Sequence, residues 1–203
     1  MRSKFITTIL IVLCSVASFA QECYFGHEYV QSSSTLYKVK HSGPDRTIHK
    51  TRCMYLEDVR NVMLFKRTSY SRSTGEPFGN GDINPLAILR DETVPYRIMQ
   101  TILPAEQFDA CLASRNEIWC DALVDPVSYE VGELLFELFY GEDDKQMLTI
   151  TPEQISEFEK QFRMKIMPAV SITERDKDWD YVRIQCCIFH PDVLQPKGEV
   201  LTK

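Results

Sequence analysis

Four histidines and seven cysteines are the residues with which this chain could hold a metal ion or attack a substrate. The sharpest spacing combines His49-x3-Cys53 with Cys186-Cys187-x2-His190, which could supply two imidazole and two thiolate ligands for zinc. The same side chains could form a nucleophile and its base, but the sequence identifies no third residue that would orient the base. Because the ligand order differs from that of zinc fingers and oxidised cysteines cannot bind a metal, we expect no metal and no cofactor.

Alternating carboxylates at Asp176, Asp178 and Asp180 resemble the opening of a calcium-binding EF-hand loop. That loop needs glycine at its sixth position and glutamate at its twelfth, where this chain has Tyr181 and Cys187. We therefore expect a polar turn between two strands.

The N-terminus has the pattern of an export signal. Arg2 and Lys4 precede an apolar segment over residues 5–16, and a small-x-small site ends at Ala20, directly before Gln21. This pattern predicts cleavage between Ala20 and Gln21 and a periplasmic or secreted protein. No later stretch is apolar for long enough to span a bilayer, so we expect no integral membrane segment after cleavage.

The charge balance excludes partners that need a basic surface. Removing the 20-residue leader takes away Arg2 and Lys4 and leaves 21 basic against 29 acidic residues, a net charge of −8. Nucleic acids and anionic membranes need clustered Lys and Arg, so we expect no nucleic-acid partner.

Six cysteines follow the leader, and an even number in an exported chain favours disulfides. The candidates are Cys23, Cys53, Cys111, Cys120, Cys186 and Cys187. If the last two lie in a strand, their side chains point to opposite faces and need different partners. The helix that holds Cys111 must end before Cys120 for these two residues to pair locally.

We divide the exported chain into an irregular, β-rich part over residues 21–85 and a compact α+β part over residues 86–203, which could still form one domain. Residues 36–39 alternate like a short strand, and residues 53–67 could form one helix or two strands. Residues 69–85 are rich in Gly, Asn, Ser and Pro, which predicts a long exposed loop at the boundary.

Two helices are predicted in the C-terminal part. Thr151-Pro152-Glu153-Gln154 combines an N-cap, a proline at the first helical position and an acidic first turn, which predicts a helix over residues 152–166. Pro104 opens the second helix, with Phe108, Cys111 and Leu112 on one face.

Residues 127–140 have two interpretations. Alternation over 127–131 and 134–140, with Gly132-Glu133 between, predicts a β-hairpin. Apolar residues also occur there at helical spacing, which leaves one amphipathic helix as the alternative. We favour the hairpin because glycine weakens a helix by about 1 kcal/mol.

The apolar pattern of residues 169–172 and 181–189 predicts two further strands that complete the sheet. Together these elements predict an α+β fold, with a mostly antiparallel sheet packed by two helices on one face. Their order is compatible with a ferredoxin-like arrangement.

The leader, the segment 127–140 and the segment 148–155 (LTITPEQI) resemble small exported bacterial proteins that form a domain-of-unknown-function family. The resemblance covers about the last hundred residues. It implies no established activity.

Aromatic residues in the N-terminal part indicate binding. Tyr24, Phe25, Tyr29 and Tyr37 could form a surface for a glycan or a partner protein. Serine-hydrolase, phosphate-loop and dinucleotide motifs are absent from the sequence, which favours a non-enzymatic binding or interaction protein. The alternative is a secreted hydrolase that uses paired carboxylates.

Overall fold

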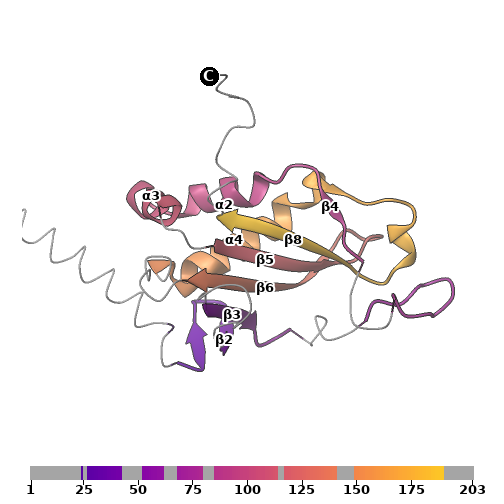
Figure 1. Cartoon of the computed structure of the whole chain (residues 1–203), viewed down its shortest axis with the longest axis horizontal. Helices are drawn as coiled ribbons and strands as arrows, with labels where there is room; N and C mark the ends of the chain where they lie inside the picture. Colours follow the sequence, from indigo (N-terminus) through magenta and orange to yellow (C-terminus); the bar gives the residue numbers. More distant parts are fainter. Residues whose placement is uncertain are drawn as a thin grey trace, which may run out of the picture.

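The computed structural model describes Tyr24 and residues 27–42, 52–61, 68–79, 85–113, 117–140 and 149–189. They form an α+β fold whose main sheet has six antiparallel strands (Figure 1). The predicted leader and its cleavage site lie outside the described residues, as do Cys23, Phe25, His49 and His190. None of the described helices is long and apolar enough to cross a membrane.

The elements follow one another as β1 (Tyr29–Gln31), β2 (Leu36–Ser42), β3 (Arg52–Asp58), β4 (Ile88–Leu89), α2 (Val94–Ile102), α3 (Ala105–Ala113), β5 (Glu117–Val124), β6 (Val131–Tyr140), α4 (Pro152–Lys165), β7 (Val170–Ser171) and β8 (Val182–Phe189). Short 3₁₀ turns, η3 and η4, cover Met167–Ala169 and Asp176–Asp178. The main sheet has the strand order β1-β2-β3-β6-β5-β8, and β4 pairs with β7 in a small second sheet.

Helices cover one face of the main sheet. Phe158 of α4 packs edge-on against Phe136 of β6, with ring centroids 5.7 Å apart, and Phe108 of α3 contacts Phe189 of β8 at 5.4 Å. In Figure 1, α4 lies behind the sheet. The two predicted helices on one face are confirmed, and α2 is a third that the sequence analysis did not identify.

The start of α4 confirms the predicted cap. Thr151 accepts a hydrogen bond from the backbone N–H of Gln154 at 3.3 Å, and the Gln154 side chain accepts one from the Thr151 N–H at 2.8 Å. This reciprocal pair satisfies two N–H groups that a helix start would otherwise leave open. The helix then buries Ile155, Phe158 and Phe162 against the sheet.

The ferredoxin-like arrangement does not form. Strand β6 lies between β3 and β5, as one split β-α-β unit requires. In a ferredoxin-like sheet the last strand then joins the outer edge of the first strand. Here β2 occupies that edge of β3, and β8 pairs with β5 instead.

The predicted position of the hairpin turn was wrong, and so was the helix alternative for residues 127–140. Residues Val131–Tyr140 form one strand, and its hairpin partner is β5, which the sequence analysis missed. The turn lies between them, where the Asp125 carboxylate accepts the backbone N–H groups of Val127 and Ser128 at 2.8 and 3.1 Å. Because Asp satisfies turn backbone groups directly, the chain reverses there and not at Gly132.

The N-terminal strands belong to the same sheet as the C-terminal ones. Strand β2 confirms the prediction for residues 36–39, and β3 confirms the strand alternative for the first part of 53–67, whose last six residues lie outside the described ones. β3 pairs with β6, so both predicted parts share one sheet. The predicted closing strands 169–172 and 181–189 correspond to β7 and β8, although β7 pairs with β4.

Candidate functional site

A polar hollow of about 660 Å³ lies between the β1–β2 turn, Arg60 and the outer side of α4. We call it the α4 groove. Its lining residues are Ser33, Ser34, Thr35, Arg60, Glu153, Ser156, Glu157, Glu159, Lys160, Arg163 and Met164. Two further hollows, of about 450 and 430 Å³, lie beside α2 and beside Trp119. The α4 groove is the candidate site because a buried carboxylate, Glu159, and its ion-pair partner Arg163 form its floor.

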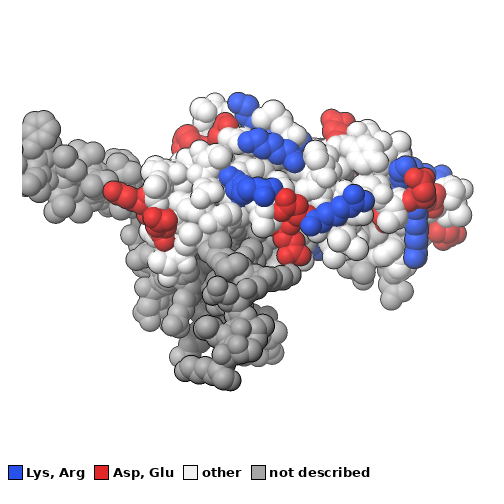
Figure 2. Space-filling model, turned by 90° about the horizontal axis from the view of Figure 1, so that it is seen from above, with Lys and Arg blue, Asp and Glu red and all other residues white. Residues whose placement is uncertain are grey.

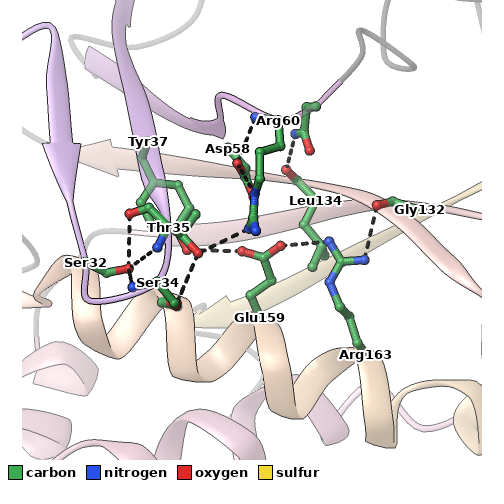
Figure 3. A network of polar contacts seen from close by, with 12 residues as sticks. Ser32, Ser34, Thr35, Tyr37, Asp58, Arg60, Gly132, Leu134, Glu159 and Arg163 are labelled. Carbon is green, nitrogen blue, oxygen red and sulfur yellow. Dashed lines mark hydrogen bonds and ion pairs between the residues drawn. The ribbon is translucent and has the colours of Figure 1, made fainter.

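Glu159 is the central residue of this floor (Figure 3), and it is only 5% exposed. The Tyr37 hydroxyl donates a hydrogen bond to Glu159 Oε2 at 3.0 Å, and Arg163 Nη2 contacts Oε1 at 2.7 Å. A buried carboxylate is strongly destabilising unless it is paired and hydrogen-bonded. These two partners satisfy both oxygens and fix the orientation of the Glu159 side chain.

Arg163 connects α4 to the start of β6. Its Nη1 donates to the carbonyl oxygen of Val131 and, at 3.1 Å, to that of Gly132. Its other terminal nitrogen is occupied by Glu159. Arg163 is therefore a structural part of the floor, because both of its terminal nitrogens are engaged within the protein.

Asp58 and Arg60 form a second ion pair at the end of β3. Asp58 is buried, and Arg60 donates to its two oxygens from Nε at 3.0 and 2.9 Å and from Nη2 at 2.5 Å. Burial by itself raises the pKa of the Asp58 carboxyl, but the hydrogen bonds and charge of Arg60 outweigh it and lower the pKa below its usual value. Asp58 thus stays ionised and holds Arg60 at the groove.

The turn between β1 and β2 closes the other wall. Ser32 Oγ accepts the backbone N–H groups of Ser34 and Thr35 at 3.3 and 2.8 Å, which shapes the turn. The hydroxyls of Ser34 and Thr35 lie 3.0 and 3.3 Å from the Ser156 hydroxyl of α4. Arg60 Nη2 also donates to Thr35 Oγ1 at 3.3 Å. Turn, helix and ion pair therefore form one connected network.

The surface of the groove offers both donors and acceptors to a ligand. The Arg60 and Lys160 side chains are 66% and 70% exposed, and the Glu157 carboxylate, 43% exposed, lies 3.7 Å from Lys160. The groove thus suits a ligand with many hydroxyl groups better than one with a high charge of a single sign. Basic and acidic side chains are also interspersed on the face of the molecule that Figure 2 shows.

Tyr37 is held in its neutral form. Burial, followed by the charge of Glu159, raises the pKa of the Tyr37 hydroxyl far above its usual value. The hydroxyl therefore keeps its proton at neutral pH and can donate it to Glu159. This makes it a positioning group and not a base.

A separate set of charges lies on the other face of the sheet. Asp121 has no exposed surface and pairs with Arg183, yet burial outweighs this partner and raises the pKa of Asp121. Burial, and then the charge of Asp121, raises the pKa of Glu137 on the neighbouring strand. These are the described carboxylates whose ionisation is most disfavoured, but Asp121 has no surface that a substrate could touch.

The predicted aromatic surface was wrong for two of its four residues. Tyr24 and Tyr37 are 0% and 1% exposed, and the Tyr24 hydroxyl donates to the Ile150 carbonyl oxygen at 2.7 Å. Tyrosine rings pack into a core when the hydroxyl finds a partner there, which explains both cases. Tyr29 is 45% exposed, with Lys38 over its ring, and Phe25 lies outside the described residues. Tyr37 still belongs to the site, as part of its floor.

The described cysteines are all thiols in this structure: Cys53, Cys111, Cys120, Cys186 and Cys187. Helix α3 ends at Ala113, before Cys120, but no disulfide joins Cys111 to Cys120. Cys53 on β3 and Cys186 on β8 are separated by two strands, so they are at least about 14 Å apart and cannot share a zinc ion.

The alternating aspartates form a polar turn, as expected. Asp176 accepts the N–H of Thr173 at 2.8 Å, Asp178 that of Ser73 at 3.0 Å, and Asp180 that of Tyr70 at 2.8 Å. Asp178 and Asp180 anchor the loop 68–79, and Asp176 caps the turn in which it lies. The three carboxylates therefore do not point toward a common site. Within the described ranges, no cluster of His, Cys, Asp and Glu could hold a metal ion.

The sequence analysis missed the charged residues of the site: Asp58, Arg60, Glu159 and Arg163. The sequence did contain a signal for Glu159 and Arg163, which is their spacing along the predicted helix. Glu159 follows Ile155 by four residues and so falls on the buried stripe of α4, and Arg163 follows it by another four. The pairing of Asp58 with α4 through Arg60 and Thr35 had no local signal.

Comparison with known proteins identifies a solved structure with a similar fold, but it assigns no activity to this chain. The structure is similar to the crystal structure of a DUF5043 family protein from Bacteroides uniformis, with a TM-score of 0.59 and 16% sequence identity over 88% of this chain and 95% of that one. No family model matches the sequence, and no curated protein matches it significantly. The neighbour therefore supports a fold shared with a bacterial domain of unknown function.

Proposed function

We propose that this chain is an exported, non-enzymatic binding protein whose α4 groove holds a hydroxyl-rich ligand, in the first place an oligosaccharide. The observation that carries this proposal is the network around Glu159 and Asp58, which fixes a mixed set of donors and acceptors beside an open hollow of about 660 Å³.

The chemistry of the groove matches that of a sugar. Each sugar hydroxyl both donates and accepts, and the groove presents exposed nitrogen donors on Arg60 and Lys160, carboxylate acceptors on Glu153 and Glu157, and serine hydroxyls that do both. Because the network holds the turn and Arg60 in place before any ligand arrives, binding loses less side-chain freedom than it would at a flexible surface.

The test uses the full chain and a printed array of neutral and uronate-bearing oligosaccharides, followed by calorimetry on those that bind. Lys160→Ala should weaken binding about tenfold or more, because it removes a charge-assisted hydrogen bond. Lys165→Ala is the matched control: this residue is on the same helix but outside the groove, and its Nζ donates to Gln161. If no saccharide binds, or if both variants bind like the wild type, the proposal fails.

A hydrolase with paired carboxylates is the second candidate, and the raised pKa values of Asp121 and Glu137 are its support. The zero exposure of Asp121 counts against it. To separate the two functions, any oligosaccharide that binds is incubated with the wild type, Asp121→Asn and Glu137→Gln. If the wild type hydrolyses it and both variants do not, the protein is a hydrolase and the proposal of a non-enzymatic binding protein is wrong.

A further inference from the structure

Two cysteines that are 66 positions apart in the sequence face each other in the sheet. Cys120 of β5 and Cys186 of β8 are direct partners in the antiparallel register, and both point to the core, with 0% and 4% exposure. The Cys186 sulfur lies 3.2 Å from the carbonyl oxygen of Cys120. The Cys186 thiol thus lies directly against Cys120, whose own side chain interacts with it.

The backbone spacing at this pair suits a covalent link. Arg183 turns its N–H and C=O toward Pro85 and Ala87, so the even-numbered residues of β8 turn theirs toward β5. Cys120 and Cys186 are therefore a hydrogen-bonded pair, whose Cα atoms lie about 5.5 Å apart. Disulfides most often join Cα atoms that are about 5.5–6 Å apart.

At each of the two other described cysteines of the sheet, a register partner on a neighbouring strand is an aromatic residue. Cys187 is on the opposite face of β8 and has Trp119 as its register partner, and Cys53 has Phe139. Cys111 is on helix α3. From the register, we infer that Cys120 and Cys186 form a cross-strand disulfide when the chain folds in an oxidising compartment.

The reaction is an exchange with a disulfide-bearing oxidant, such as oxidised glutathione or a thiol oxidoreductase. The two S–H bonds and the S–S bond of the oxidant break, and one S–S bond forms between Cys120 and Cys186; the two electrons and, through solvent, the two protons pass to the oxidant, which leaves as two thiols. Burial raises the pKa of the Cys120 thiol, so the reactive thiolate is scarce once the strands are packed. The link should therefore form during folding and only slowly afterwards.

The test begins with full chain that has been reduced and unfolded in urea. The chain is refolded by dilution into a glutathione redox buffer, free thiols are alkylated under denaturing conditions, and linked peptides are mapped by mass spectrometry. We expect two fewer alkylated thiols and a peptide that joins residues 120 and 186. The same buffer added to folded, reduced protein should give this link much more slowly.

Cys187→Ser is the matched control for Cys186→Ser, because it changes the neighbouring residue on the opposite face. The Cys187 variant should keep the link and the Cys186 variant should lose it. If the Cys186 variant does not fold, the wild-type peptide map decides alone. Cys120 and Cys186 both alkylated after oxidative refolding, or either one linked to a different cysteine, would overturn the inference; neither outcome bears on ligand binding in the α4 groove.

Discussion

Replacing Tyr37 by phenylalanine tests the network beneath the α4 groove. The ring is 1% exposed and would stay packed, so the change removes only the hydroxyl that donates to Glu159 Oε2 at 3.0 Å. A hydrogen bond to a charged group contributes about 1.5–3 kcal/mol to folding. We expect the free energy of unfolding to fall by that amount, which for a chain of this size lowers Tm by about 3–12 °C.

The measurement is urea denaturation followed by circular dichroism, with Tyr29→Phe as the control. Tyr29 is 45% exposed, so its hydroxyl should contribute less than about 0.5 kcal/mol. In a double-mutant cycle with Glu159→Gln, the Tyr37 change should be less destabilising, because the acceptor is then neutral. A Tyr37 variant as stable as the control, or two strictly additive changes, would refute the proposed role of the Tyr37–Glu159 bond.

Three further predictions concern other parts of the chain. Glu137→Gln should raise Tm at pH 7, because the raised pKa of Glu137 means that its charged form destabilises the fold. This gain should shrink as the pH falls and vanish below about 4, where the wild-type carboxyl becomes protonated in both the folded and the unfolded state; a gain that is independent of pH would contradict the prediction. Thr151→Ala should lower the free energy of unfolding by about 1 kcal/mol through loss of the α4 cap, and an unchanged urea midpoint would count against the cap. Protein recovered from a periplasmic fraction should begin at Gln21 by intact mass, and a retained Met1 would remove the export hypothesis.

The elements that were predicted well have local causes. Helix α4 begins where the side chains of Thr151 and Gln154 accept each other's backbone N–H and where Pro152 has no N–H to satisfy, and these residues are close together in the sequence. The hairpin turn was misplaced because two local signals competed. Gly132 suits a tight turn, but Asp125 binds the turn backbone and gives β6 a partner over its whole length.

The candidate site could not be predicted in the same way. Tyr37, Arg60 and Glu159 are far apart in the sequence, and each has an ordinary local environment: a strand, a strand end and a helix. They meet because β2 pairs with β3 and α4 packs across the sheet. Tyr37 was identified as an aromatic residue of interest, but the sequence could not show that its ring is buried.

By itself, the sequence determined the α+β class, the cap and buried stripe of α4 and the strand character of β2 and β8, because these depend on side chains within a few residues of one another. Only the tertiary structure decided the strand order, the burial of Tyr24 and Tyr37, and the juxtaposition of Cys120 with Cys186. The physical reason is that strand pairing joins segments across many intervening residues, and the free energy that selects one pairing comes from packing of the whole core.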